Sequence, residues 1–195
     1  MKKITSSTKN KAVEIVCTAF KDIDAVTSVI KYDSKKDERV KVLFDFCVSV
    51  SMEKEGAFLT SDEMGVALLF KSWKKLSFAS AVSNYFKLVH YGISWERAPQ
   101  MILRELRLQK RRTKEKHLYF WLLGFDNSVK DLQRMIQIRD FCFGYAKELQ
   151  LPIAAETSSK GALKMYLRYG FKIYDEWKPS EDKPTLYFII RDWQD

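Results

Sequence analysis

The sequence predicts a mixed α/β domain built on one central sheet. Residues 117–171 alternate between apolar stretches of extended character and amphipathic stretches of helical spacing, in the order strand, helix, strand, helix. A helix that connects two buried strands forms a βαβ unit, which pairs the strands in parallel through a right-handed crossover. The chain has 195 residues, of which 46% are hydrophobic and only seven are glycine. One packed domain over residues 1–195 is therefore expected.

The first part of the chain is predicted to form helices followed by a β-hairpin. Helices are expected at residues 9–23, 25–32 and 35–56, where apolar side chains recur at helical spacing. The period then becomes extended in residues 57–61 and 65–72, on either side of a turn that contains acidic residues and a glycine. Residues 73–116 return to helical spacing, which predicts a helical insertion before the next strand.

The last part of the chain completes the sheet. The elements expected within it are a strand at 117–126, a helix at 134–150, a strand at 151–157 and a helix at 158–171. The last helix ends at Gly170, a residue suited to a left-handed C-cap. Two more strands, 171–178 and 185–193, are joined by a turn-rich connection that is typical of an antiparallel pair. Ligands of such sheets lie beyond the carboxyl ends of the strands, which places a site around residues 125–133 and 156–159.

Charge and cysteine content limit the possible ligands. The net charge is +9, from 34 Lys and Arg against 25 Asp and Glu, and it permits a phosphorylated cofactor or a nucleic acid without choosing between them. Cys17, Cys47 and Cys142 lie far apart in apolar surroundings, which indicates buried thiols in a reducing compartment. Two histidines and no Cys-x-x-Cys spacing argue against a structural metal site. No apolar run approaches membrane-spanning length, so a cytoplasmic protein without membrane contact is expected.

Two motifs carry a resemblance to a known family. The first is Ser159-x-x-Ala162-x-x-x-Tyr166-x-x-x-Gly170-Phe171. The second is Leu123-Gly124-Phe125-Asp126 at the end of a predicted strand. Together with the hairpin at 58–70 and the order of elements over residues 9–193, they resemble the GCN5-related N-acetyltransferase (GNAT) superfamily, which transfers an acyl group from coenzyme A to an amine. The resemblance implies a mostly antiparallel central sheet with one parallel pair of strands, 117–126 and 151–157, that splay apart.

The resemblance also implies roles for individual residues. Tyr166 takes the position of the general acid that protonates the departing thiolate. Glu156 is a candidate base, and its alternative role is that of a salt-bridged residue at a strand end. Free backbone groups near Leu123 and Phe125 hold the pantetheine arm and stabilise the developing oxyanion. The residues assigned to acetyl-CoA are Leu123, Gly124, Phe125, Lys130, Gln133, Arg134, Met135 and Ser159. For Ser159 the alternative role is a helix N-cap.

The predicted pyrophosphate loop departs from the family pattern Gln/Arg-x-x-Gly-x-Gly/Ala. Residues 130–135 read Lys-Asp-Leu-Gln-Arg-Met, so Gln133 and Met135 fill both glycine positions. A helix N-terminus attracts anions whichever residues form it, and Lys130 and Arg134 add positive charge. Acetyl-CoA is therefore still the expected ligand.

Two alternatives to an N-acyltransferase remain open. Ser128 to Asp131 form a capping-box pattern that would start the helix early and close the cradle, which favours a GNAT-fold binding or regulatory protein without catalysis. The basic run over residues 104–116 is the less favoured alternative, a nucleic-acid site, because cations also suit the C-terminus of a helix and no aromatic residues interleave them. The acceptor is expected to be a small-molecule or protein amine, and exposed edge strands near the C-terminus permit a homodimer.

Overall fold

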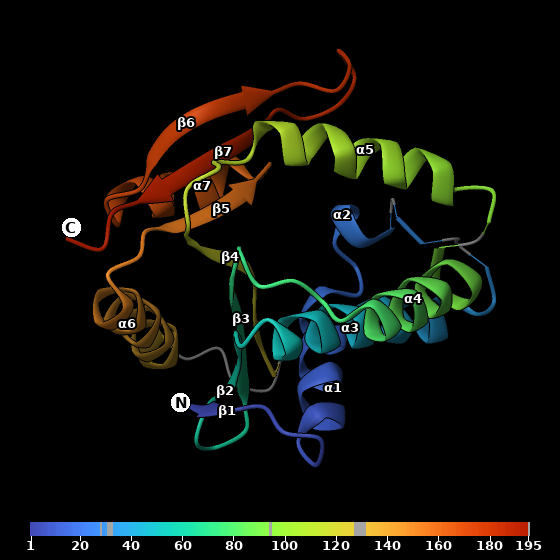
Figure 1. Ribbon diagram of the computed structural model, residues 1–195, viewed down its shortest axis with the longest axis horizontal. Coiled ribbons are helices and arrows are strands. Elements are labelled where there is room, and N and C mark those ends of the chain that lie inside the picture. Colours follow the sequence, from blue (N-terminus) through green and yellow to red (C-terminus); the bar gives the residue numbers. More distant parts are fainter. Residues whose placement is uncertain (28, 31–32, 94, 127–131, 195) are drawn as a thin grey trace.

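The computed structural model describes residues 1–27, 29–30, 33–93, 95–126 and 132–194, which form a central sheet with helices on both faces (Figure 1). The strands are β1 (Lys2–Lys3), β2 (Ala57–Leu59), β3 (Gly65–Lys71), β4 (Leu118–Phe125), β5 (Ile153–Thr157), β6 (Lys172–Trp177) and β7 (Leu186–Arg191). The helices are α1 (Lys9–Phe20), α2 (Asp24–Thr27), α3 (Lys36–Glu53), α4 (Phe78–Lys87), η1 (Leu88–Ile93), α5 (Ala98–Arg111), α6 (Leu132–Leu149) and α7 (Lys160–Arg168). No helix in the described part of the chain is long and apolar enough to cross a membrane.

The strand order is β1-β2-β3-β4-β5-β7-β6, and within the described residues only β4 and β5 pair in parallel. This arrangement confirms the predicted mixed, mostly antiparallel sheet with one parallel pair. The hairpin β2–β3 and the C-terminal pair β6–β7 also form as predicted. In addition, β7 lies between β5 and β6, so β6 forms an edge of the sheet.

Two hydrophobic clusters hold the helices to opposite faces of the sheet (Figure 1). On one face, α1 and α3 pack against β2 and β3 through fully buried side chains such as Ile15 and Phe44. On the other face, α6 and α7 pack against β4, β5 and β7, with Ile138 and Ile189 fully buried. Because successive residues of a strand point to opposite faces, β3 and β4 contribute side chains to both clusters.

A β-bulge interrupts the pairing of β3 with β4. Leu69 of β3 pairs with Phe120, whereas the preceding residue, Leu68, pairs with Leu122. Trp121 is therefore an extra residue in β4. A bulge bends its strand and increases the local twist. The chain of β4 consequently changes direction at Trp121, in the middle of the sheet.

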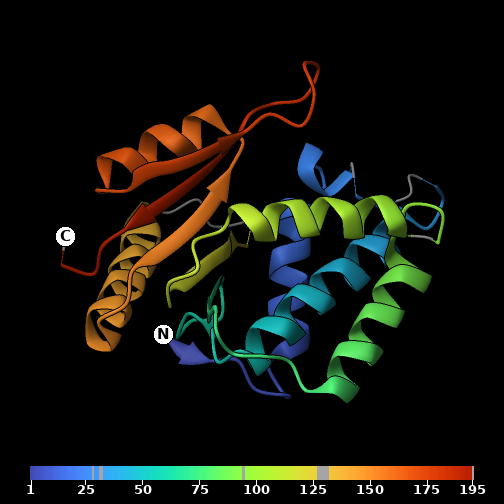
Figure 2. The ribbon, with the colours of Figure 1, turned by 45° about the horizontal axis from the view of Figure 1, so that its top comes forward.

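The inserted segment between β3 and β4 forms α4, a π-helical turn η1, and α5, which crosses above α3 and α4 (Figure 2). At the start of α5, Arg97 donates a hydrogen bond from Nη1 to the carbonyl oxygen of Ile30 (2.6 Å). At its end, Arg111 forms an ion pair with Asp175 of β6 (2.9 Å). The insertion is thus attached to the rest of the domain at both ends of α5.

Some predicted boundaries were wrong. The helix predicted at 25–32 is the single turn α2, and residues 28, 31 and 32 lie outside the described ranges. The helix predicted to run through residue 116 ends at Arg111, because Arg112 adopts an extended backbone (φ −61°, ψ 141°). Strand β1 was not predicted, since two exposed lysines carry no alternating pattern.

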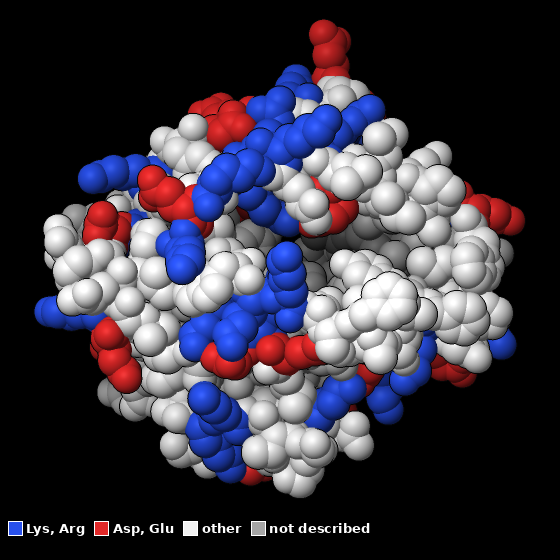
Figure 3. All heavy atoms as spheres, viewed as in Figure 1, with Lys and Arg blue, Asp and Glu red and all other residues white. Residues whose placement is uncertain are grey.

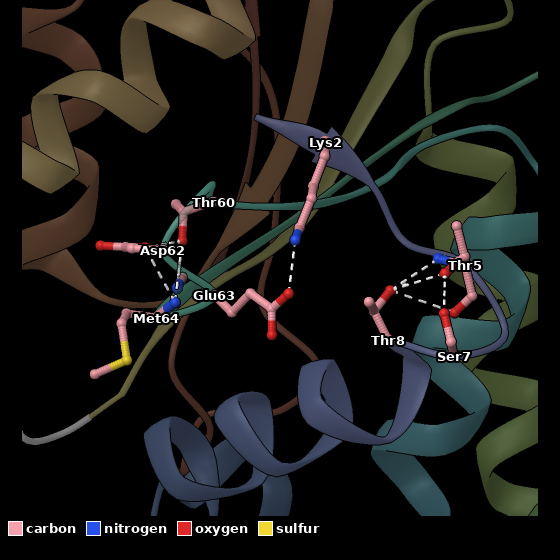
Figure 4. Close-up of polar contacts among 9 residues, drawn as sticks. Lys2, Thr5, Ser7, Thr8, Thr60, Asp62, Glu63 and Met64 are labelled. Carbon is pink, nitrogen blue, oxygen red and sulfur yellow. Dashed lines mark hydrogen bonds and ion pairs between the residues drawn. The ribbon is translucent and has the colours of Figure 1, made fainter.

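The turn of the β2–β3 hairpin is fixed by a network around Thr60 (Figure 4). The Thr60 hydroxyl donates to Asp62 (2.6 Å) and accepts hydrogen bonds from the backbone N–H groups of Met64 (3.1 Å) and Gly65 (2.9 Å). Lys2 of β1 pairs with Glu63 across the same turn (2.6 Å). These contacts hold the Asp62 carboxylate in a defined position at the end of the hairpin.

The ion pairs of Glu55 predict how stability depends on pH. Hydrogen bonds from Lys71 (2.6 Å) and Lys74 (2.7 Å) lower the pKa of Glu55 from 4.5 to about 2. Because the pKa is lower in the folded state, the stabilisation is present above about pH 4.5 and is lost as the pH falls towards 2. We expect Glu55→Gln to lower the melting temperature at pH 7 but not near pH 2. Melting curves at both values test this, with the exposed Glu181→Gln as the control.

Candidate active site

A gap opens between β4 and β5 near the centre of the sheet. The two strands pair only from Leu118 to Phe120 and from Ile153 to Ala155. Beyond these residues β4 stays paired with β3 as far as Phe125, and β5 stays paired with β7 as far as Thr157. Within the described residues, the inner edges of both strands are thus left without a strand partner. The bulge at Trp121 explains the gap, because β4 bends at the residue that follows its last contact with β5.

Tyr166 lies where the two strands part. Its ring packs edge-on against Phe120, the last residue of β4 paired with β5 (6.4 Å between centroids), and against Phe171 (5.0 Å). Burial raises the pKa of Tyr166 to about 12, with a further contribution from Cys142. The phenol therefore keeps its proton throughout the neutral range.

The sequence around α7 accounts for the orientation of Tyr166. Ser159 caps the helix, since its hydroxyl accepts a hydrogen bond from the backbone N–H of Ala162 (3.2 Å). Gly170 ends the helix in the left-handed conformation that the sequence predicted (φ 84°). Between these two caps, Leu163 and Tyr166 point into the cluster beneath α6 and α7.

Leu123, Gly124 and Phe125 form the part of β4 that borders the gap. Leu123 and Phe125 belong to the cluster on the α6–α7 face, the face from which Tyr166 approaches. Gly124 faces α1, where an added Cβ would lie 3.2 Å from Cε2 of Phe20 and 3.4 Å from Cβ of Ala19. Gly124 therefore allows α1 to pack closely against β4.

The first turn of α6 presents the residues predicted to replace the glycines of the pyrophosphate loop. Gln133 is exposed, and Met135 is 44% exposed, so neither side chain is buried in the space beside the helix end. Nη2 of Arg134 forms an ion pair with Asp62 of the hairpin (3.0 Å). Its Nη1 is buried and has no hydrogen-bond partner within the described part of the chain. Lys130 lies outside the described residues.

Glu156 lies on the face of β5 opposite to Tyr166, in a network that the sequence did not reveal. Arg112 donates from Nε to the Glu156 carboxylate (2.5 Å) and from Nη1 to Glu105 of α5 (2.6 Å). The hydroxyl of Tyr119 lies 3.4 Å from Nη2 of the same guanidinium. The Glu156 side chain is only 10% exposed. The salt-bridged role weighed for Glu156 is therefore present.

Arg112 and Glu105 were missed because they belong to the basic run over residues 104–116, whose cations also suit the C-terminus of a helix. The available signal was their spacing. In the sequence, Glu105 and Arg112 follow the buried residue Ala98 at intervals of seven, which is the spacing of one helical face. A charged residue on a buried helical stripe is expected to have a partner. His117 lies at the opposite end of β4 from the gap, where its Nδ1 contacts the carbonyl oxygen of Glu115 (2.7 Å).

No protein-family model and no curated protein sequence matches the chain. Solved structures do match over nearly its whole length. One is a Corynebacterium glutamicum protein described as "histone acetyltransferase HPA2 and related acetyltransferase". Its sequence is 15% identical to this chain and its TM-score is 0.67, with 98% of this chain and 94% of that chain covered. The C-terminal condensation domain of Ebony, in complex with β-alanyl-dopamine, has 12% identity and a TM-score of 0.69, with 97% and 96% covered.

An arylalkylamine N-acetyltransferase 2 from Aedes aegypti has 10% identity and a TM-score of 0.60, with 98% and 97% of the two chains covered. These similarities establish the fold. The chain has the fold of the acetyltransferases, and the GNAT-like fold predicted from the two motifs is confirmed.

Proposed function

We propose that this protein is an N-acyltransferase that transfers an acetyl or other acyl group from coenzyme A to an amine. The observation that carries the proposal is the gap between β4 and β5, with the protonated phenol of Tyr166 at its apex. The acetyltransferase fold supports it, as do structural neighbours that act on amines, among them a polyamine N-acetyltransferase of Drosophila melanogaster.

Three parts of the chain fit acetyl-CoA. The unpaired inner edge of β4 around Leu123 and Phe125 offers backbone groups to the pantetheine arm. The buried, unpartnered Nη1 of Arg134 and the N-terminus of α6 provide a positive region for the pyrophosphate. The N-cap residue Ser159 lies next to the same opening and offers a hydroxyl. Coenzyme A, when bound, supplies the acyl group as a thioester.

In this proposal, each residue around the gap would have a separate role in the acyl transfer. A backbone N–H of β4 near Leu123 stabilises negative charge on the carbonyl oxygen. Tyr166 donates its proton to the sulfur as the carbon–sulfur bond breaks. On the opposite face, the Glu156 carboxylate is fixed by Arg112 and accepts the proton of the incoming amine, directly or through water.

A catalytically inactive protein with the same fold is the second candidate, favoured by the glycine positions that Gln133 and Met135 fill. Such a protein would bind coenzyme A or another ligand in the gap and turn nothing over. Binding of acetyl-CoA without turnover on a broad panel of amines would support this candidate.

Calorimetry with acetyl-CoA tests the donor site. We expect the wild type to bind, and Arg134→Gln to weaken binding about tenfold, since a hydrogen bond to a charged group contributes about 1.5–3 kcal/mol. Arg139→Gln is the matched control, because Arg139 lies on the same helix and pairs with its neighbour Asp140 (2.6 Å). If the wild type released no heat, or if both variants bound like it, the assignment of Arg134 and the α6 N-terminus would be wrong.

A further inference from the structure

We propose that the acceptor binds on the face of the sheet opposite to Tyr166, beneath α5, and that it is a monoamine with an aromatic body. This inference rests on the proposed function and adds to it the acceptor's site and chemical class. The proposal rests on a line of aromatic side chains, which we call the aromatic row. The row consists of Tyr119, Phe70, Trp121, Phe46 and Tyr85.

The aromatic row is continuous. Its successive ring centroids are separated by 5.2 Å (Tyr119 to Phe70), 5.6 Å (Phe70 to Trp121), 6.4 Å (Trp121 to Phe46) and 5.2 Å (Phe46 to Tyr85). Three of these contacts are edge-to-face, with interplanar angles of 83°, 85° and 62°. This geometry is favoured between aromatic rings and suits an additional ring placed against them.

Two residues of the row flank the point where the strands part. Tyr119 precedes Phe120, the last residue of β4 paired with β5, and the bulged residue Trp121 directly follows it. Phe120 contacts Tyr166 on one face of the sheet, and Trp121 packs with the cluster on the other face. A ligand along the row therefore approaches the apex of the gap from the side that Tyr166 does not occupy.

The row is only partly covered by the protein. Tyr119 and Phe70 are buried, Trp121 and Phe46 are half-buried, and Tyr85 is 52% exposed. A ligand would therefore contact the row mainly at Trp121, Phe46 and Tyr85. Figure 3 shows this face of the molecule hollowed between a ridge of Lys and Arg side chains over α5 and an uncharged lobe over α4. At the end near the gap, Nζ of Lys54 lies 4.7 Å above the Phe70 ring, and the Arg112 guanidinium lies 5.0 Å from the Tyr119 ring.

The charges beneath α5 decide between two kinds of amine. Glu105 and Glu156 are both bound by Arg112, and Lys54 adds a second cation within range of Arg112 and Glu105. Two carboxylates and two cations cancel, so this region has no surplus negative charge to hold a polycation. An aromatic monoamine thus fits the row better than a polyamine.

Calorimetric titration of the full chain with phenylethylamine and with spermidine tests the inference. We expect phenylethylamine to bind at least tenfold more tightly, and Trp121→Leu to weaken its binding about tenfold, as expected for the loss of an aromatic contact. Trp95→Leu is the matched control, since Trp95 is 60% exposed and lies outside the row. If Trp121→Leu does not fold, Tyr85→Ala replaces it, because Tyr85 is on the exposed helix α4.

Tighter binding of spermidine, or equal binding of phenylethylamine by wild type and both row variants, would overturn the inference. So would the absence of phenylethylamine binding by a protein that binds acetyl-CoA, and that result would leave the proposed function intact. Binding of phenylethylamine that depends on Trp121, in a protein that does not bind acetyl-CoA, would uphold the aromatic site and remove the transferase proposal.

Discussion

Replacing Tyr166 with phenylalanine is expected to slow acetyl transfer about 100-fold, within the range that a general acid contributes. The substitution removes only the hydroxyl, so the ring keeps its packing against Phe120 and Phe171. The affinity for acetyl-CoA and the thermal stability are expected to change little. Consumption of the thioester in the presence of an amine panel measures the rate, and calorimetry measures the affinity.

Tyr169→Phe is the matched control for this prediction. Tyr169 lies on the same helix end, and its ring contacts Phe143 (6.3 Å) away from the gap. Its substitution is expected to leave the rate unchanged. The pKa of Tyr166, about 12, adds a second test, because the wild-type rate should not fall from loss of the phenol proton until the pH nears that value. A Tyr166→Phe variant with the wild-type rate would exclude the phenol as the acid.

Gly56→Ala is expected to cause the largest loss of stability among glycine substitutions in the described residues. Gly56 joins α3 to β2, and an added Cβ would lie 2.1 Å from Cα of Phe70 and 2.2 Å from the carbonyl oxygen of Leu69. Both atoms belong to the backbone of the central strand β3, so the clash cannot be relieved by a side-chain movement. We expect a loss of about 3 kcal/mol, or about 10 °C in melting temperature.

Gly144→Ala provides the opposite control. Gly144 is an exposed residue of α6, and no atom lies within 4 Å of its added Cβ. Because alanine favours the helix, this substitution is expected to stabilise the protein by about 1 kcal/mol. Chemical denaturation of the two variants measures the difference. Equal changes in the free energy of unfolding for the two variants would contradict the close approach of Gly56 to the backbone of β3.

The sequence predicted those features that a local pattern determines. The βαβ unit followed from periodicity, the end of α7 from Gly170, and the place of Tyr166 from a motif within one helix. The bulge at Trp121 could not be predicted, because one extra residue inside a continuous apolar strand leaves the pattern of hydrophobic residues unchanged. That bulge nevertheless accounts for the gap on which the candidate site depends.

Contacts between segments that are distant along the chain also could not be predicted from the sequence. Arg112 and Glu156 are 44 residues apart, and each belongs to a stretch whose local pattern has another sufficient explanation. The aromatic row joins three strand residues to Phe46 of α3 and Tyr85 of α4, and no spacing along the chain relates them. The placement of β7 between β5 and β6 likewise depends on which edge of β5 is free.

The division of the interior into two clusters has a consequence for how such a protein can change. The packing beneath α6 and α7 shares the strands β3 and β4, but no helix, with the packing beneath α1 and α3. Within the described part of the chain, no residue of α4 or α5 belongs to either cluster, so remodelling these two helices would leave both clusters intact. In the proposed transferase, a new choice of amine could thus arise by altering α4 and α5 alone, while the packing around Tyr166 is inherited unchanged.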